Sequence, residues 1–282
     1  MTNPDTLRRP CPAARPSDEF CKGRAMRRAI AATLLLTLAL TDARADPPVP
    51  ASAYLVPAFQ AGDRIDQVFS RTFAIRAPGF EDIVGRTSGT ATYRAVESAT
   101  DRPRLRLDYR YDGRSEGGGM LELRDAGATA CLDGACAPQW DASGLIYNPR
   151  LWGAPPAALR VGQHWTVDID SPWELGTPGR QTVTVVALDP LAHRVTLKRE
   201  GEGDGAYLGD RLQVMLKRGD KNYAVKVQPG RSHWYGYTTF RHGVVTSDEL
   251  MVERPVTLSS KELGRVEARE REYILLNEMP AE

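Results

Sequence analysis

The chain has 282 residues, with 37 Lys or Arg against 36 Asp or Glu, and 41% of the residues are hydrophobic. Residues 1–45 hold eight basic and four acidic residues, so 29 basic and 32 acidic residues follow them, a net charge of about −3. A chain without a concentrated basic face is not expected to bind nucleic acid or an anionic membrane surface as its main partner.

An apolar run lies in MRRAIAATLLLTLALTDARA, residues 26–45. Two arginines precede the run, and Ala43-Arg44-Ala45 gives the small-x-small pattern of signal-peptidase sites. The run is shorter than the roughly 20 residues that cross a bilayer. The segment therefore predicts a cleavable signal peptide that ends near Ala45. Because such a signal works from the N-terminus, we expect residues 1–25 to be a mis-assigned leader and the mature protein to be periplasmic or secreted by a bacterium.

The mature chain divides by composition into two parts. Residues 46–60 are rich in proline and predict a flexible tether. Residues 61–282 predict one all-β, antiparallel domain, a β-sandwich, barrel or half-barrel, because short alternating segments are separated by turn residues. The clearest strand is RLRLDYRYD at 104–112, in which leucines and tyrosines alternate with charged residues. The other expected strands are 64–75, 86–96, 120–131, 163–169, 180–188, 193–200, 211–217, 222–228, 232–240 and 243–252.

Two segments fit this pattern less well. Residues 137–162 contain four prolines and predict a long crossing loop, with a helical turn at 156–160. Residues 264–276 fit a strand and also a helix, and we expect a strand because the rest of the domain is sheet.

Two cysteines remain in the mature chain, in the sequence ACLDGAC. Asp133-Gly134 favours a two-residue type I′ hairpin turn, because glycine tolerates the positive φ that this turn requires. Cys131 and Cys136 then face each other one pair beyond the turn, with Cα atoms roughly 4.5 Å apart. We expect a disulfide between them in an oxidising compartment, where so short a loop stabilises the fold by about 2 kcal/mol.

One motif is typical of an enzyme, the G-x-S-x-G of Gly113 to Gly117, with Ser115 at its centre. In hydrolases this serine lies on a turn between a buried parallel strand and a helix. Here the preceding strand alternates with arginines, and two further glycines follow the motif. A glycine-rich hairpin is the favoured interpretation, and a serine hydrolase built from Ser115 with His233 or His242 is the less favoured one.

Neither the histidines nor the acidic residues form a metal-binding motif. None of the four histidines has the spacing of a local zinc site, although His233 and His242 flank one strand and its turn. The acidic segments Asp168–Asp170 and 202–210 (EGDGAYLGD) lack the ordered spacing of a calcium loop. No cofactor or metal is expected.

Large aromatic residues gather in the second half of the chain. In His233-Trp234-Tyr235-Gly236-Tyr237 a strand places Trp234 on one face and both tyrosines on the other, so that one face is a candidate binding surface. Aromatic filling of a core is the competing interpretation. The candidate ligand-binding residues are Trp165, Trp173, Trp234, Tyr235 and Tyr237.

These features predict an exported, non-enzymatic β-rich protein of the cell envelope that binds an apolar or amphipathic ligand, such as a lipid. The alternatives are a protein-interaction or structural module that uses a sheet edge or an aromatic patch, and the serine hydrolase above. The sequence does not identify a protein partner.

Overall fold

Alternation of buried and exposed side chains extends over most of the chain that the structure describes. The structure is a computed structural model, and it describes residues 49–97, 102–127, 129–136, 143–170, 178–205 and 213–280. Its elements are β1 (Val49–Pro50), α1 (Ser52–Leu55), β2 (Arg64–Arg76), β3 (Ile83–Ala95), β4 (Arg104–Tyr111), β5 (Arg114–Arg124), a 3₁₀ turn (Asp125–Gly127), β6 (Thr129–Leu132), β7 (Ala135–Cys136), α2 (Pro149–Trp152), β8 (Ala158–Leu159), β9 (His164–Ile169), β10 (Gly179–Asp189), β11 (Arg194–Gly203), β12 (Gln213–Arg218), β13 (Lys221–Pro229), β14 (Ser232–Arg241), β15 (Val244–Ser260) and β16 (Gly264–Glu278).

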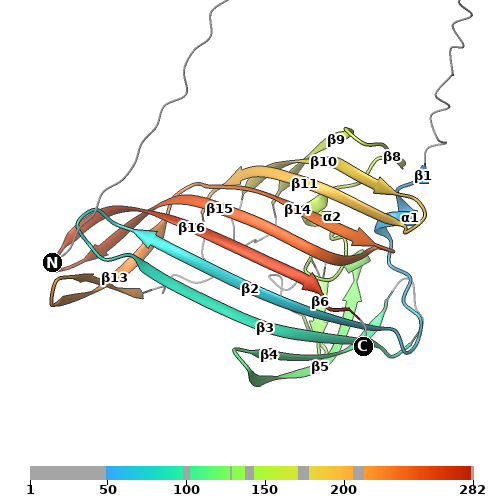
Figure 1. Cartoon of the computed structure of the whole chain (residues 1–282), viewed down its shortest axis with the longest axis horizontal. Helices are drawn as coiled ribbons and strands as arrows, with labels where there is room; N and C mark the ends of the chain where they lie inside the picture. Colours follow the sequence, from blue (N-terminus) through green and yellow to red (C-terminus); the bar gives the residue numbers. More distant parts are fainter. Residues whose placement is uncertain are drawn as a thin grey trace, which may run out of the picture. The chain divides into compact units, whose positions relative to one another are not determined.

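Fourteen of these strands form one antiparallel sheet, so the predicted all-β class is confirmed (Figure 1). Its main path runs β7-β6-β5-β4-β3-β2-β16-β15-β14-β11-β10-β9, and β13 and β12 continue from β15. Among the described residues β7, β9 and β12 each pair with a strand on one side only, so the part of the sheet that the structure describes does not close on itself. It bends along the long strands β2, β3, β15 and β16 (Figure 1). This is one large sheet and not the pair of face-to-face sheets of a sandwich.

The two faces of the sheet differ in burial, and we call them inner and outer. Along β14 the inner positions, which include Trp234 and Phe240, are buried, and outer positions such as His233 and Tyr235 are exposed. In β4 the leucines and tyrosines lie on the inner face and the arginines on the outer face, as the sequence predicts. A period of two thus places the core on one side of the sheet.

The inner face carries three hydrophobic clusters. The first joins α1 and α2 to strands β9, β10, β11 and β14, and the second lies between β2–β6 and residues 145–146. The third lies between the β12–β13 hairpin and strands β2, β15 and β16. At this third cluster the hairpin reaches the start of β3, because the backbone N of Glu81 donates to the carbonyl of Lys217 (2.9 Å) and the Arg218 guanidinium lies 3.9 Å from the centre of the Phe80 ring.

Two segments differ in part from the sequence-based expectations. The expected strand 120–131 is two strands, β5 and β6, separated by the 3₁₀ turn. The helical turn expected at 156–160 is wrong: β8 lies there, paired with β1, and the turn of helix is α2. The missed signal is Asn148-Pro149, since the Asn148 side chain accepts a hydrogen bond from the Arg150 N–H (2.9 Å) and proline suits the first helical position.

The expected tether and the C-terminal segment also have clear structures. Residues 49–59 form β1 and α1 and place Tyr54, Leu55 and Phe59 in the core, so this part of the chain is packed and not a free tether. Its apolar side chains outweigh the effect of its prolines. The segment at 264–276 is strand, within β16, as expected.

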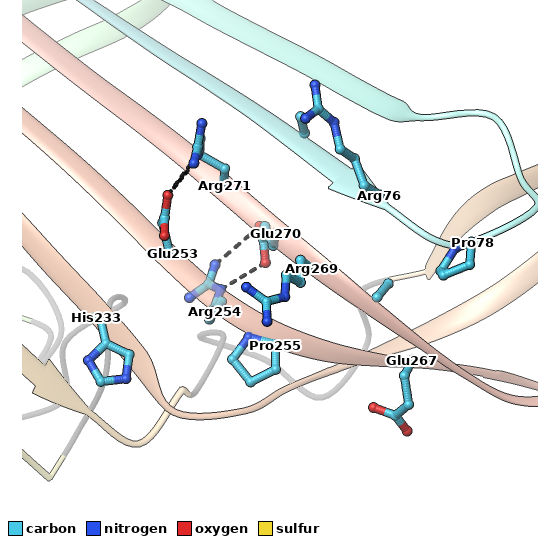
Figure 2. A pocket seen from close by; sticks show the side chains of 12 residues that line it. Arg76, Pro78, His233, Glu253, Arg254, Pro255, Glu267, Arg269, Glu270 and Arg271 are labelled. Atoms are coloured by element: carbon cyan, nitrogen blue, oxygen red, sulfur yellow. Dashed lines mark hydrogen bonds and ion pairs between the residues drawn. The ribbon is translucent and has the colours of Figure 1, made fainter.

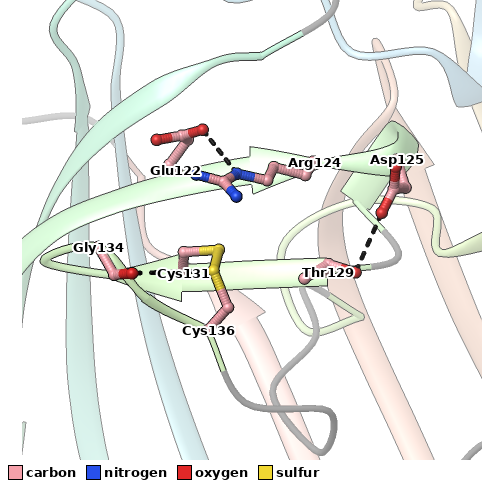
Figure 3. The surroundings of a disulfide bond; sticks show 7 residues. All are labelled: Glu122, Arg124, Asp125, Thr129, Cys131, Gly134 and Cys136. Atoms are coloured by element: carbon pink, nitrogen blue, oxygen red, sulfur yellow. Dashed lines mark hydrogen bonds and ion pairs between the residues drawn. A yellow bond between two sulfur atoms is a disulfide. The ribbon is translucent and has the colours of Figure 1, made fainter.

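The cysteine hairpin forms as predicted (Figure 3). Asp133 and Gly134 have φ of 48° and 81°, Leu132 pairs with Ala135, and Cys131 pairs with Cys136. The two cysteines are joined by a disulfide, with Cα atoms 4.2 Å apart. The bridge fastens the short edge strand β7 to β6.

No helix in the described part of the chain is long and apolar enough to cross a membrane.

Candidate ligand-binding site

A groove with a volume of about 800 Å³ lies over the outer face of β14, β15, β16 and β2 (Figure 2). Its lining combines charged side chains, which we call the wall, with the small apolar residues Ala74, Pro78 and Pro255, which we call the floor. The residues that line it are Ala74, Arg76, Pro78, His233, Glu253, Arg254, Pro255, Glu267, Ala268, Arg269, Glu270 and Arg271.

The groove lies where β15 changes its neighbour. Upstream of Pro255, β15 pairs with β14, and from Val256 onwards it pairs with β13. The Gly230 N–H donates to the Pro255 carbonyl (2.8 Å), so the backbone groups of Pro255 face the β13–β14 junction. A proline there leaves the hydrogen bonds between β15 and β16 intact. A Cβ on Gly230 would lie 2.8 Å from the Pro255 ring, so glycine is needed for this close approach.

Cross-strand pairing places the charged side chains in rows. One row runs across four strands from His233 through Glu253 and Arg271 to Ala74. The next row contains Pro255, Arg269 and Arg76. Neighbours within a row have Cβ atoms roughly 4.5–5.5 Å apart, so their charges interact.

The acidic groups of the groove already have partners. Arg271 forms an ion pair with Glu253 at 2.5 Å, and both side chains are about half exposed. The Thr257 hydroxyl donates to Glu267 (3.2 Å). Arg269 also belongs to the wall. Among the described residues, no carboxylate lies within 4 Å of its guanidinium.

Directly beneath the groove, the inner face of the same strands holds a second set of ion pairs. Arg254 donates to both oxygens of Glu270 (2.8 and 3.3 Å) and lies 3.6 Å from Glu272, which also accepts from Arg71. The side chains of Arg254, Glu270 and Glu272 are at most 5% exposed. Such a buried network holds β15 and β16 in one register, which gives the outer face a rigid surface.

The aromatic residues predicted to bind a ligand are divided between the two faces. Trp234 is 1% exposed on the inner face, and its Nε1–H donates to Gln181 (3.0 Å). Trp165 packs against the same cluster, and its Nε1–H donates to the Trp152 carbonyl (2.7 Å). Trp234 is thus part of the core, and Trp165 is partly buried against it. Trp173 lies outside the described residues.

Tyr235 and Tyr237 lie on the outer face, 48% and 46% exposed. They follow His233 along β14, beside the groove but outside its lining. The structure thus brings the two tyrosines together on the surface and separates them from the two tryptophans.

The charged wall of the groove was missed in the sequence. The signal is the run RVEARERE at 265–272, which as a strand places Arg269 and Arg271 on one face and Glu270 and Glu272 on the other. Charges on both faces of one strand are unusual, because the inner ones must be buried as pairs.

The geometry around Ser115 differs from the one that a serine hydrolase requires. Ser115 lies within β5, paired with Arg110 of β4, in an antiparallel hairpin and not between a strand and a helix. His233 is the second residue of β14 and His242 follows its end, so roughly 30 Å separates them along the strand. His242 instead stacks on His193, with ring centres 4.8 Å apart.

The acidic segments are held by arginines. Asp168 pairs with Arg180 (2.8 Å), and Arg231 pairs with both Glu202 (2.6 Å) and Asp204 (3.3 Å). The described residues contain no group of three or more potential metal ligands.

Comparison with known proteins leaves the family open. No family model matches the chain, and no curated protein matches it. Among solved structures, a lipovitellin structure concerned with lipid–protein interactions aligns with a TM-score of 0.35 and 12% identity over 79% of this chain, which spans about a quarter of the lipovitellin chain (26%). DynF from the dynemicin biosynthesis pathway of Micromonospora chersina aligns with a TM-score of 0.24 and 6% identity, over 83% of this chain and 86% of its own. At these values neither alignment assigns a fold family or a function.

Proposed function

We propose that this protein is an exported, non-enzymatic binding protein that holds an amphipathic ligand in the groove on the outer face. The observation that carries the proposal is the composition of the groove, whose lining combines the small apolar residues Ala74, Pro78 and Pro255 with charged side chains. Ligand sites are concave and mostly apolar, with a few polar groups that orient the ligand. A ligand with an apolar chain and a charged end matches both parts.

Export is the second part of the proposal. The segment at 26–45 has the features of a cleavable signal, and the Cys131–Cys136 disulfide is of a kind that persists in oxidising compartments. A periplasmic or secreted protein meets lipids and other envelope amphiphiles there, which suits a binding role.

The proposal is tested by filling the groove. Ala74 lies on the outer face of β2 in the groove lining, and Ala74→Trp would place a large ring over the floor. Val68 also lies on the outer face of β2, 41% exposed and outside the lining, so Val68→Trp is a matched control. We expect the full chain to bind a fluorescent long-chain fatty acid, and Ala74→Trp to weaken this binding at least about tenfold while Val68→Trp leaves it unchanged.

Equal binding by the two variants would place the ligand elsewhere on the protein. If the wild-type chain binds none of a set of long-chain acids, lysophospholipids and monoacylglycerols, the proposed function is wrong.

A further inference from the structure

The two rows of the groove differ in their balance of charge. In the first row, Arg271 lies between Glu253 and Ala74, and its charge is neutralised by the ion pair with Glu253. The row continues beyond His233 to Glu202 of β11, so acidic and basic groups alternate across the sheet. This row has no need of a counterion.

The second row contains two cations and no acid. Arg269 pairs in register with Arg76 on one side and with Pro255 on the other. Like charges directly opposite each other on one face of a sheet destabilise it. Arg76 is partly neutralised by Asp82, whose carboxylate lies 2.9 Å from its Nε. Among the described residues Arg269 has no carboxylate at ion-pair distance, so the positive charge of the row is concentrated there.

Resting on the proposed function, we infer that Arg269, assisted by Arg76, binds an oxyanion head group, a phosphate or a carboxylate, of the amphipathic ligand. A guanidinium presents a planar fork of N–H donors that matches the oxygens of either group. Binding of an anion also relieves the repulsion between the two arginines. Pro255 and Ala74, the neighbours of this pair, provide apolar surface for the part of the ligand next to the head group.

The test compares ligands that share an acyl chain and differ in the head group. Binding of lysophosphatidylglycerol, of the monoacylglycerol with the same chain, and of inorganic phosphate alone is measured by calorimetry with the full chain. We expect lysophosphatidylglycerol to bind about tenfold more tightly than the monoacylglycerol, which is the effect of one charge-assisted hydrogen-bonded pair. Added salt should reduce this preference, since the groove is open to solvent.

Two substitutions locate the effect. Arg269→Gln should abolish the preference for lysophosphatidylglycerol while leaving monoacylglycerol binding unchanged, and Arg76→Gln should reduce it by a smaller factor because Asp82 already lowers the charge of Arg76. Arg86→Gln is the matched control, because Arg86 is exposed on the outer face of β3 and does not line the groove. It should leave the preference intact.

The outcomes separate this inference from the proposed function. If both lipids bind equally and Arg269→Gln changes neither, the protein binds amphiphiles but the anion site is wrong. A third outcome is that neither lipid binds, inorganic phosphate binds, and Arg269→Gln removes the phosphate binding. The anion site is then correct and its ligand is free phosphate, and the proposal of an amphipathic ligand is wrong. If nothing binds, both are wrong.

Discussion

Two neighbouring ion pairs on β15 and β16 have the same chemistry and opposite surroundings. Glu253 pairs with Arg271 on the outer face, and in the next cross-strand pair Arg254 pairs with Glu270 on the inner face. The outer side chains are 49% and 64% exposed, and the inner ones 5% or less. The two pairs lie on the same strands and contain the same residue types, so they differ in burial and in the further contacts of the inner pair with Glu272.

Burial changes what each pair contributes. An exposed pair interacts through water and is worth about 0–1 kcal/mol. A buried pair has lost the hydration of both ions, so it adds little net stability while intact, but removal of one partner leaves a buried charge unbalanced. We therefore expect the inner pair to be required for the stability of the sheet. The outer pair contributes little to stability, so its side chains are able to change partners when a ligand binds.

The largest expected effect comes from breaking the inner pair alone. Arg254→Met keeps most of the side-chain volume and leaves the carboxylates of Glu270 and Glu272 without this guanidinium. We expect the free energy of unfolding to fall by about 3–5 kcal/mol, measured by urea denaturation at pH 7. A loss below about 1 kcal/mol would mean that the inner pair behaves like an exposed one, and the comparison would fail.

A second variant shows that the loss comes from unbalanced charge. Adding Glu270→Gln to Arg254→Met removes one of the two carboxylates that lose this guanidinium, and we expect part of the lost stability to return. No recovery in the double variant would assign the loss to packing around Arg254.

A smaller effect is expected from a tyrosine of the inner face at high pH. Burial, with a smaller contribution from nearby Tyr111, raises the pKa of Tyr93 from 10.0 to about 12. Between these values the unfolded chain releases the phenol proton and the folded chain keeps it, so this group contributes full stability below pH 10 and loses it as the pH rises towards 12. The stability of Tyr93→Phe should therefore fall by about 1 kcal/mol less than that of the wild type between pH 10 and pH 11, measured by urea denaturation. An equal alkaline loss in both proteins would show that Tyr93 is not responsible.

Much of the fold could be predicted because alternation and turn chemistry are local signals. The strand at 104–111 and the disulfide hairpin at Asp133-Gly134 follow directly from a period of two and from the tolerance of glycine for positive φ. Strand order could not be predicted, because the pairing of β16 with β2 joins segments about 200 residues apart and depends on the whole inner face. For the same reason the sequence left sandwich, barrel and half-barrel open.

The candidate site was the harder part. The sequence drew attention to aromatic residues, but Trp234 is buried in the core and Trp165 packs against it. Whether a charged side chain lines a groove depends on which strands lie next to its own strand. Arg269 is a candidate anion-binding residue only because Arg76 and Pro255 are its cross-strand neighbours. Local pattern gives the face on which a side chain lies, and only the register gives its partners.

The smallest expected effect comes from the outer pair, and it completes the comparison. Glu253→Gln removes the partner of Arg271 on the exposed face, where water and salt can take its place. We expect the free energy of unfolding to fall by less than about 1 kcal/mol in low salt, and the difference from wild type to shrink further in about 0.5 M sodium chloride, because salt screens exposed charges. Urea denaturation of Glu253→Gln beside Arg254→Met measures the two faces under the same conditions. A loss of several kcal/mol that persists in salt would mean that the outer pair is also a structural element, and that the groove wall is not free to exchange its partners for those of a ligand.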